Sequence, residues 1–545
     1  MTECMDIYRD MKEIISQKNS SGIVWKSTKK QWFLSVGYFN SLATYWIVPL
    51  CLFTLWWVAS NEQWMPAQIL PTPKDTWSAF IELSSQDLWS QLAISLERFG
   101  LGLFSGVLGG VFLGILLGYS HIAEKYLSAT FYALVIIPTL AWLPLLMIWL
   151  GIENALKIFI IFKATMVPIA LHTQAGVRDI QPKLKEMAEI LQFNRLTLLT
   201  KLVLPATLPY FFTGLRLAVA AGWTSLIAVE LLASSEGIGY LMVTGRQLFQ
   251  LDIVFVAIFV IASVGIIFDF ILHQIERKFV FWPHAALSAH AFHKKSKTDV
   301  FKSWVLPLSL VVLWAMSSWF NLILSQILPA PWKILEALWS GIQDFSLTTA
   351  MYYSLYRAIL GLIIGGLIGA SVGIVVGLFK PIENLLAPTL NTLRLIAIFA
   401  WIPLLTAWFG LQDLSKIVFI SIATFFPMFI ATWKGMSSIP MQLIEVSNTL
   451  RMTLFQRLTL LILPSIAPSM FAGFRLALLY SWMASFGAEY LMGSGIGIGS
   501  YMMAAQQNFE MDRVIAATVL VAGLGAILAW LGKITENYAT SWRKN

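Results

Sequence analysis

Charged residues recur at matching positions inside two long apolar stretches. Arg216 and Glu230 lie fourteen residues apart in one stretch, and Arg475 and Glu489 have the same spacing in the other. Ionisable side chains in apolar segments of membrane length are candidates for gating a solute or lining its path. Fourteen residues of α-helix rise about 21 Å, so neither arginine can pair with the glutamate of its own helix.

Each of these residues also has a structural interpretation. The two arginines begin their predicted helices, where a long side chain can extend its charge to the membrane surface. Each glutamate precedes a Gly-Ile-Gly segment, at 237–239 and 497–499, and can accept backbone N–H bonds from that turn. We favour the structural role for both pairs and keep gating as the alternative.

Two tryptophans are each followed by a proline within a predicted helix. Trp142 precedes Pro144 by two residues, and Trp401 precedes Pro403 in the same way. Proline lacks a backbone N–H and bends a helix, and interrupted helices are tolerated in membranes where they line a cavity. Both interpretations stay open: a kink, or a segment that lines the solute path.

The sequence contains none of the common catalytic or nucleotide-binding motifs. It has no GxxxxGK[ST] nucleotide loop, no HExxH pair and no serine–histidine arrangement shared by the two stretches. His284, His290 and His293 lie in a lysine-rich segment without acidic or cysteine partners. We therefore expect no catalytic residue, no metal site and no cofactor in this chain.

Composition identifies a membrane protein. The chain has 545 residues, of which 58% are hydrophobic and 12% charged, whereas soluble domains average about 45–50% and about 25%. Long apolar runs such as 101–119 and 253–268 are typical of membrane helices and not of alternating barrel strands. The net charge of +8 is concentrated between the apolar runs, which indicates orientation in a membrane and not nucleic-acid binding.

The sequence contains an internal repeat, so that one unit occurs twice along the chain. AWLPLL at 141–146 returns as AWIPLL at 400–405, and GLRLA at 214–218 returns as GFRLA at 473–477. Each copy predicts six membrane helices, the third of which covers 126–150 and 385–409. Basic residues gather in the head, the middle and the tail of the chain, which places all three in the cytoplasm and makes the repeats parallel.

The predicted fold is therefore an all-α membrane protein of twelve transmembrane helices in two parallel six-helix repeats. Its expected parts are a cytoplasmic head (1–41), a first repeat (42–280), a basic linker (281–302), a second repeat (303–535) and a cytoplasmic tail (536–545). One helix of each repeat has glycine at every fourth position, which lets another backbone approach closely in lipid. The central glycines of this predicted packing face are Gly106, Gly110, Gly114, Gly365, Gly369 and Gly373.

Between the fourth and fifth predicted spans, each copy has an amphipathic loop, at about 176–208 and 435–467. Glu186 stands at the same distance before Leu204-Pro205 as Glu445 stands before Leu463-Pro464. The loop resembles that of bacterial ABC importer membrane subunits, which reads EAA, three residues, Gly, nine residues, Ile, one residue, Leu-Pro. The matching positions are Glu186, Ala188, Leu204, Pro205, Glu445, Leu463 and Pro464, with Ser447 where the second copy would have alanine.

The family's glycine is replaced by Gln192 and Arg451, so we expect a differently shaped turn. The segments LPTP, SLERFGLG and AWLPLL are similar to the nitrate/sulfonate/taurine/bicarbonate branch of these permeases. In that branch a six-helix permease forms a dimer, so the chain resembles two permeases fused in one polypeptide with a type I importer fold.

The resemblance implies a substrate pathway for a small anion or organic solute in a bacterial inner membrane. It implies two cytoplasmic ATPase subunits, which would bind ATP and Mg and receive the two loops. The sequence leaves open whether a periplasmic substrate-binding protein takes part. The alternative is a twelve-span secondary transporter driven by an ion gradient, for which Asp269 is a candidate carboxylate, although Ala529 occupies its position in the second copy.

Overall fold

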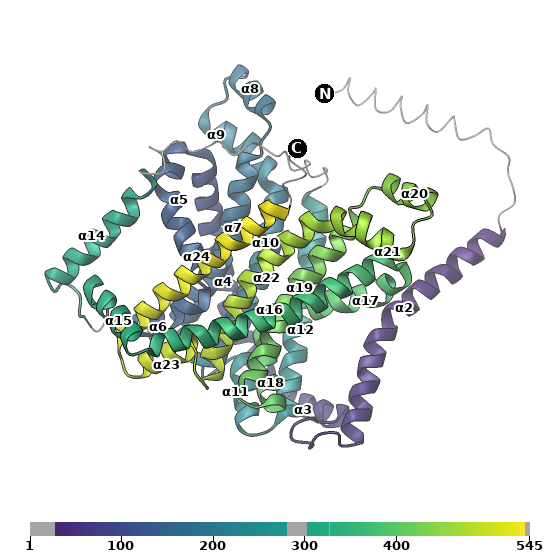
Figure 1. Ribbon diagram of the computed structural model, residues 1–545, viewed down its shortest axis with the longest axis horizontal. Helices are drawn as coiled ribbons and strands as arrows, with labels where there is room; N and C mark the ends of the chain where they lie inside the picture. The colour runs from purple at the N-terminus through teal and green to yellow at the C-terminus, as the bar shows by residue number, and fades with distance from the viewer. Residues whose placement is uncertain (1–27, 281–301, 326, 540–545) are drawn as a thin grey trace.

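The computed structural model describes residues 28–280, 302–325 and 327–539 (Figure 1). The head and tail predicted above lie partly outside these ranges, and the linker lies outside them apart from Lys302. His284, His290 and His293 are also outside the described residues. All elements in the described ranges are helical.

The helices of the two repeats follow the same order. The first repeat contains α2 (Thr28–Asn61), α3 (Pro73–Ser85), α4 (Leu88–Tyr119), α5 (His121–Ile136), η1 (Thr139–Trp142), α6 (Leu143–Leu150), α7 (Asn154–Arg178), α8 (Pro182–Ile190), α9 (Arg195–Leu198), η2 (Leu199–Val203), α10 (Leu204–Ala233), α11 (Ile238–Gln247) and α12 (Leu251–Phe279). The second contains α14 (Val305–Trp319), α15 (Pro331–Gln343), α16 (Ser346–Leu378), α17 (Lys380–Leu393), η3 (Ile398–Trp401), α18 (Ile402–Phe409), α19 (Asp413–Ser437), α20 (Met441–Thr449), α21 (Leu454–Gln456), η4 (Arg457–Ile462), α22 (Leu463–Met492), α23 (Ile498–Gln507) and α24 (Met511–Ala539).

The described residues contain 8 helices that are long and apolar enough to cross a membrane, four in each repeat. Two bent pairs bring the number of candidate spans to 10: α5 turns by 94° into η1 and α6, and α17 turns by 90° into η3 and α18. Tyr45–Asn61 and α14 are shorter apolar helices. The protein is thus an all-helical, multi-pass membrane protein, and the number twelve stays a prediction.

The bend in the third span has a different origin from the predicted one. Pro144 and Pro403 lie in the first turns of α6 and α18, where a missing N–H breaks no helical hydrogen bond. The chain turns before them, and Ile137 is extended because the ring of Pro138 disfavours a helical residue ahead of it. In the second repeat Ala397 has nearly the same backbone conformation as Pro138, so proline is not required for this bend.

The glycine-bearing helices pack face to face on the fourth spans, as α4 on α7 and α16 on α19. Gly106 faces Thr165, and a Cβ atom built on it would lie 1.8 Å from Thr165 Oγ1. A Cβ atom on Gly365 would lie 2.1 Å from the carbonyl oxygen of Ser421. The close approach of two backbones therefore depends on glycine at these positions.

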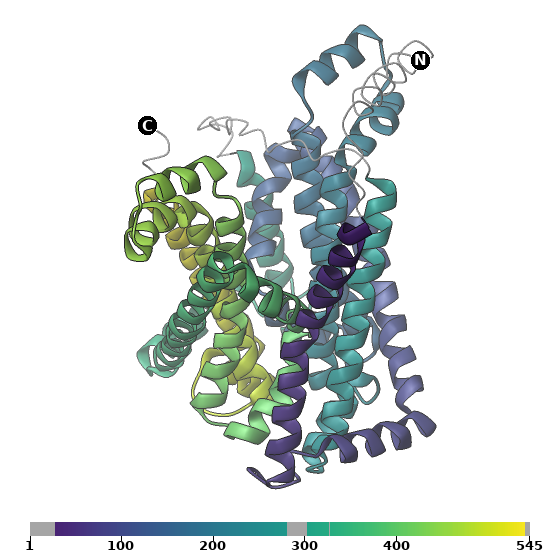
Figure 2. The same ribbon diagram turned by 90° about the vertical axis from the view of Figure 1, so that its right-hand side faces the viewer.

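The two repeats exchange elements across their interface. The first apolar helix of each repeat packs on the bent span of the other, α2 on α17 and α14 on α5, and α2 runs along the outside of the bundle (Figure 2). The indole N–H of Trp149 donates to the carbonyl of Ile327 at 3.0 Å, and that of Trp408 donates to Ile69 at 3.2 Å. These reciprocal bonds join the bent span of each repeat to the loop before the short helix α15 or α3 of the other.

Replacing Gly106 with alanine is expected to lower the free energy of unfolding by about 1–3 kcal/mol, because the added methyl overlaps Thr165. Gly100→Ala on the same helix is the matched control, since nothing lies within 4 Å of its Cβ position. The control should be neutral or stabilising by up to about 1 kcal/mol. Unfolding followed in detergent measures both, and equal effects would contradict the packing argument.

Candidate functional site

A buried ion pair joins α4 to α10 in the first repeat. Arg98 Nη1 lies 3.1 Å from Glu230 Oε1, and the two residues are 4% and 1% exposed. The hydroxyl of Ser95 donates to both carboxylate oxygens, at 2.8 and 2.9 Å. The N–H of Gly239 donates to Glu230 at 3.0 Å, and the N–H of Ile238 donates to Ser95 Oγ at 2.9 Å.

The second repeat contains the same arrangement. Arg357 Nη1 lies 2.8 Å from Glu489 Oε1, and Ser354 donates to Glu489 Oε2 at 2.7 Å. The N–H groups of Ile498 and Gly499 donate to Ser354 and Glu489, at 2.9 and 3.1 Å. We call these two sets, Ser95–Arg98–Glu230 and Ser354–Arg357–Glu489, the Ser–Arg–Glu clusters.

The local sequence explains each cluster. Serine and arginine three residues apart share one face of α4 or α16, and the glycine contact with the fourth span fixes that helix in place. A Cβ atom on Gly239 would lie 2.5 Å from the Cβ of Glu230, so only glycine allows the turn to approach the carboxylate. A charge buried this deeply is tolerated because it is both paired and hydrogen-bonded. Each glutamate accepts a backbone N–H bond from its Gly-Ile-Gly turn, as the structural interpretation expects. A gating role for Glu230 and Glu489 stays a hypothesis.

Sequence reasoning did not identify Arg98 and Arg357. Both were present in the sequence as a Ser-x-x-Arg pattern at the same position of the two repeats, in the N-terminal part of the glycine-bearing helix. A repeated charge within an apolar helix is the signal that could have found them.

Arg216 and Arg475 lie far along the helix from these clusters and have partners of their own. Arg216 forms a hydrogen-bonded ion pair with Glu276 of α12, and its Nε lies 3.8 Å from Asp269. Arg475 pairs with Glu536 of α24 at 3.1 Å. Each arginine thus ties the fifth span to the last helix of its own repeat, which is more than an extension toward the membrane surface. Asp269 accordingly faces an arginine.

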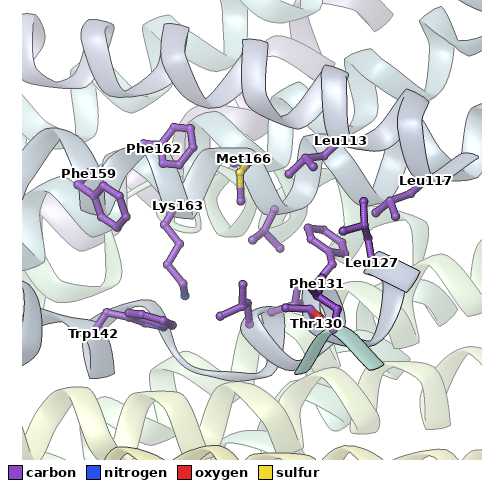
Figure 3. Close-up of a pocket in the computed structure, with 14 residues that line it drawn as sticks. Leu113, Leu117, Leu127, Thr130, Phe131, Trp142, Phe159, Phe162, Lys163 and Met166 are labelled. Carbon is purple, nitrogen blue, oxygen red and sulfur yellow. The ribbon is translucent and has the colours of Figure 1, made fainter. Parts of the chain in front are cut away.

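The bent span of the first repeat borders an apolar cavity of about 330 Å³ (Figure 3). Lys163 of α7 reaches across this cavity, donates to the carbonyl of Ile137 at 3.0 Å and lies 5.5 Å from the centre of the Trp142 ring. The bend leaves that carbonyl without a helical N–H, and the ammonium group satisfies it. Ile422 occupies the position of Lys163 in the second repeat, so the two bends are stabilised differently.

The Trp-Pro segments lie between the two repeats. The η1–α6 segment contacts α23 and α24, and the η3–α18 segment contacts α10, α11 and α12. Pro144 and Pro403 are buried in these contacts. This position is compatible with lining a path between the halves, and that role for Trp142, Trp401 and the two prolines stays a prediction.

The two amphipathic loops form helices that project from one end of the bundle, α8 and α20 (Figure 1). Ala188 and Ser447 are buried, at 5% and 2% exposure, whereas Glu186 and Glu445 are exposed. Leu204-Pro205 and Leu463-Pro464 begin α10 and α22, directly after the π-helical turns η2 and η4.

The turn after each of these helices has the left-handed backbone conformation that glycine favours, although neither turn has glycine at that position. Gln192 and Arg451 both have a φ of 50°, in the left-handed region. The N–H of Phe193 donates to Ala188 at 3.0 Å, and the N–H of Met452 donates to Ser447 at 3.1 Å. These six-residue closures are Schellman motifs, so the prediction of a differently shaped turn was wrong. The loop imposes the left-handed conformation on residues that do not favour it.

Comparison with known proteins identifies the duplicated unit. Residues 106–281 and 361–537 each match the family described as "Binding-protein-dependent transport system inner membrane component", and together they make up more than half of the chain. The chain belongs to this family. It carries the permease unit twice, as the internal repeat predicted.

Three relatives illustrate the similarity to single permeases. The chain is 35% identical over 237 residues to the putative aliphatic sulfonates transport permease protein of Bacillus subtilis, covering 43% of this chain and 86% of that protein. It is 32% identical to the taurine transport system permease protein of Escherichia coli, over 42% of this chain and 86% of the relative. It is 30% identical to the nitrate import permease protein of Leptolyngbya laminosa, over 40% and 80%. All three relatives are named as transport or import permeases.

Replacing Arg98 of this permease with methionine is expected to cost about 3–5 kcal/mol of stability, because Glu230 is left charged and buried. The double variant Arg98→Met, Glu230→Met should recover part of that loss, since no unpaired charge remains. Arg513 provides the control, because its ion pair with Glu510 is exposed and its loss should cost about 1 kcal/mol or less. Unfolding curves in detergent test this, and similar losses for Arg98 and Arg513 would contradict it.

Replacing Gln192 with glycine is expected to stabilise the first loop by about 1 kcal/mol, because a side chain in the left-handed region is strained and glycine is not. Glu189→Gly, inside α8, should instead weaken the loop by about 1 kcal/mol. Amide hydrogen exchange at Phe193 reports both changes. Faster exchange in the Gln192→Gly variant would show that the side chain supports the turn.

Proposed function

We propose that this chain forms the complete transmembrane pathway of an ATP-driven ABC importer for small anions or anionic organic solutes. The observation that carries the proposal is that two permease units of one family lie in one chain, with matching loop helices at one end of the bundle. A single-unit permease would need a second copy to present two such loops, and this chain presents both. The proposed halves are residues 42–280 and 303–535.

The loops are proposed to couple the pathway to two cytoplasmic ATPase subunits. Both loops expose large apolar side chains, among them Ile190 at 80%, Leu450 at 63% and Phe455 at 74% exposure. Exposed apolar patches on short amphipathic helices are typical of docking into a partner's groove. Glu186 and Glu445 lie at the exposed surface of the same helices. ATP and Mg would be bound by those subunits and not by this chain.

The substrate class follows from the relatives' names and from charge. The three relatives reported above are named for aliphatic sulfonates, taurine and nitrate, and each of these solutes carries an anionic group. The family description supports delivery by a periplasmic substrate-binding protein. In this proposal the loops and both termini face the cytoplasm of a bacterial cell, and the Ser–Arg–Glu clusters lie near the opposite membrane face.

The proposal is tested by recovering the chain from native membranes with a mild detergent and identifying what accompanies it. A nucleotide-binding ATPase is expected at two copies per chain. Aspartate at both Ile190 and Leu450 should abolish recovery of the ATPase, because it places charge on the docking surface. The matched control puts aspartate at Phe249 and Phe509, which are equally exposed at 74% and 76% and follow α11 and α23 at the opposite end of the bundle. A chain that is recovered alone and takes up solute in liposomes with an ion gradient would contradict the proposal and support a secondary transporter.

A further inference from the structure

A polar cavity of about 530 Å³ opens beside the first Ser–Arg–Glu cluster, at the start of α7. Its lining includes Arg98, Asn154 and Lys157 from α4 and α7, and Ser235 from the loop that follows α10. Its lining residues flank the connections from α6 to α7 and from α10 to α11. Figure 1 places α6 and α11 at the end of the bundle opposite to the loop helices α8 and α20. Neither the relatives nor the mechanism proposed above assigns a role to it.

The feature that needs an explanation is Lys157. Its side chain is 4% exposed, and no hydrogen-bond or ion-pair partner for it occurs within the described part of the chain. Glu230, Glu153 and Glu236 act on this ammonium group from beyond ion-pair distance, so an anion that enters the cavity can make the direct contact that these carboxylates do not make. The neighbouring Arg98 is cationic and is already paired with Glu230 at 3.1 Å and with Glu236 at 3.4 Å.

In the second repeat, the lysine at the equivalent position has a hydrogen-bond partner within the protein. Lys416 is the equivalent of Lys157 and donates to the carbonyl oxygen of Ser494. Asp413 replaces Asn154 and pairs with Arg357 at 2.7 Å. The second repeat therefore supplies a carbonyl to its lysine and a second carboxylate to its arginine. In the first repeat Arg98 also pairs with a second carboxylate, that of Glu236, and Lys157 has no such carbonyl among the described residues.

The difference originates in the loop after the fifth span. The second repeat has one more residue between its glutamate and the Gly-Ile-Gly segment than the first repeat has. Gly493 and Gly495 adopt φ values of 61° and 73° in that longer loop, which contributes the Ser494 carbonyl to Lys416. The shorter loop of the first repeat, 234–237, makes no such bond to Lys157 among the described residues.

Other groups around the cavity favour a negative ligand at Lys157. The helix α7 begins at Asn154, and its preceding residue Glu153 makes no capping bond to the first turn, so the positive end of the helix dipole is directed there. The side-chain amide of Asn154 accepts from Arg98 through its oxygen at 2.8 Å, which leaves its N–H groups as donors. Glu153 and Glu236 carry negative charge at the rim, but both are exposed to water, which screens their charges more than that of the buried lysine.

We propose that this cavity binds a small anion whose charged head group, a sulfonate, carboxylate or nitrate, pairs with Lys157 and accepts from Asn154. The second repeat has closed the equivalent site with its own Ser494 and Asp413. The two halves of the pathway are therefore unequal at this face, with one anion site per chain. That the transported solute binds first at this site rests on the function proposed above, whereas the binding of an anion to the site does not.

The test is a titration of the purified full chain in lipid nanodiscs with trifluoromethanesulfonate, followed by 19F line broadening without nucleotide. Lys157→Met is expected to raise the Kd at least tenfold. Asn154→Asp, which installs the carboxylate of the second repeat, should raise it severalfold. Lys416→Met and Asp413→Asn are the matched variants in the second repeat and should leave the Kd within a factor of two.

Thermal unfolding of the same samples separates binding from folding. Lys157→Met should keep or raise the Tm, since an unpartnered ammonium is removed, and Lys416→Met should lower it, since the bond to Ser494 is lost. Unchanged binding in Lys157→Met, or equal weakening by the two lysine variants, would overturn the proposal. Equal binding of uncharged trifluoroethanol would also overturn it. If Lys157→Met does not fold, unchanged affinity in Asn154→Asp overturns it. None of these readouts requires an ATPase, so a failure of the proposed transport function would be seen separately.

Discussion

The close contact of two helix backbones in each repeat is the constraint on which the remaining structure depends. Glycine at every fourth residue of α4 and α16 lets these helices meet α7 and α19 without intervening side chains. In lipid, where hydrophobicity does not drive helices together, such packing is a main source of association. It also holds the Ser-x-x-Arg face of the same helix against the fifth span, where the glutamate lies. The buried ion pair and the turn after it therefore follow from a contact that involves no charge.

Much of this architecture could be predicted from the sequence, because each pattern occurs in both copies and the two copies could be compared. The all-helical membrane fold, the duplication and the glycine packing face all depend on local patterns of apolar and small residues. The loops with Glu186 and Glu445 were found by their equal spacing in the two copies, and their interpretation rested on the family resemblance. Family membership of both halves confirms the fused-permease interpretation.

The sequence did not reveal contacts between residues distant along the chain. The partners of Glu230 and Glu489 come from a helix more than a hundred residues away. Residue spacing within one helix cannot predict such contacts between helices. The bend before Trp142 was assigned to the wrong proline, because Pro144 begins a new helix and does not interrupt an old one. The turn at Gln192 was expected to change with the loss of glycine, yet the surrounding hydrogen bonds impose the same conformation.

The two halves are alike in framework and unlike in charge at one face. One extra loop residue gives Lys416 a carbonyl partner, and aspartate in place of asparagine gives Arg357 a second carboxylate. Lys157 has no hydrogen-bond partner among the described residues. A fused chain permits this divergence, since each half can change without altering the other. A homodimer of identical permeases would carry the same change in both halves.

The most direct test of the account is the distance between the two loop helices in the presence and absence of ATP. Spin labels at Glu189→Cys and Asn448→Cys, equivalent exposed positions on α8 and α20, would be placed in the proposed complex with ATPase subunits after Cys4 and Cys51 are replaced by serine. The account predicts that a non-hydrolysable ATP analogue shortens this distance, as closing ATPase subunits draw the loops together. A distance that ignores nucleotide and changes only with an ion gradient would contradict it.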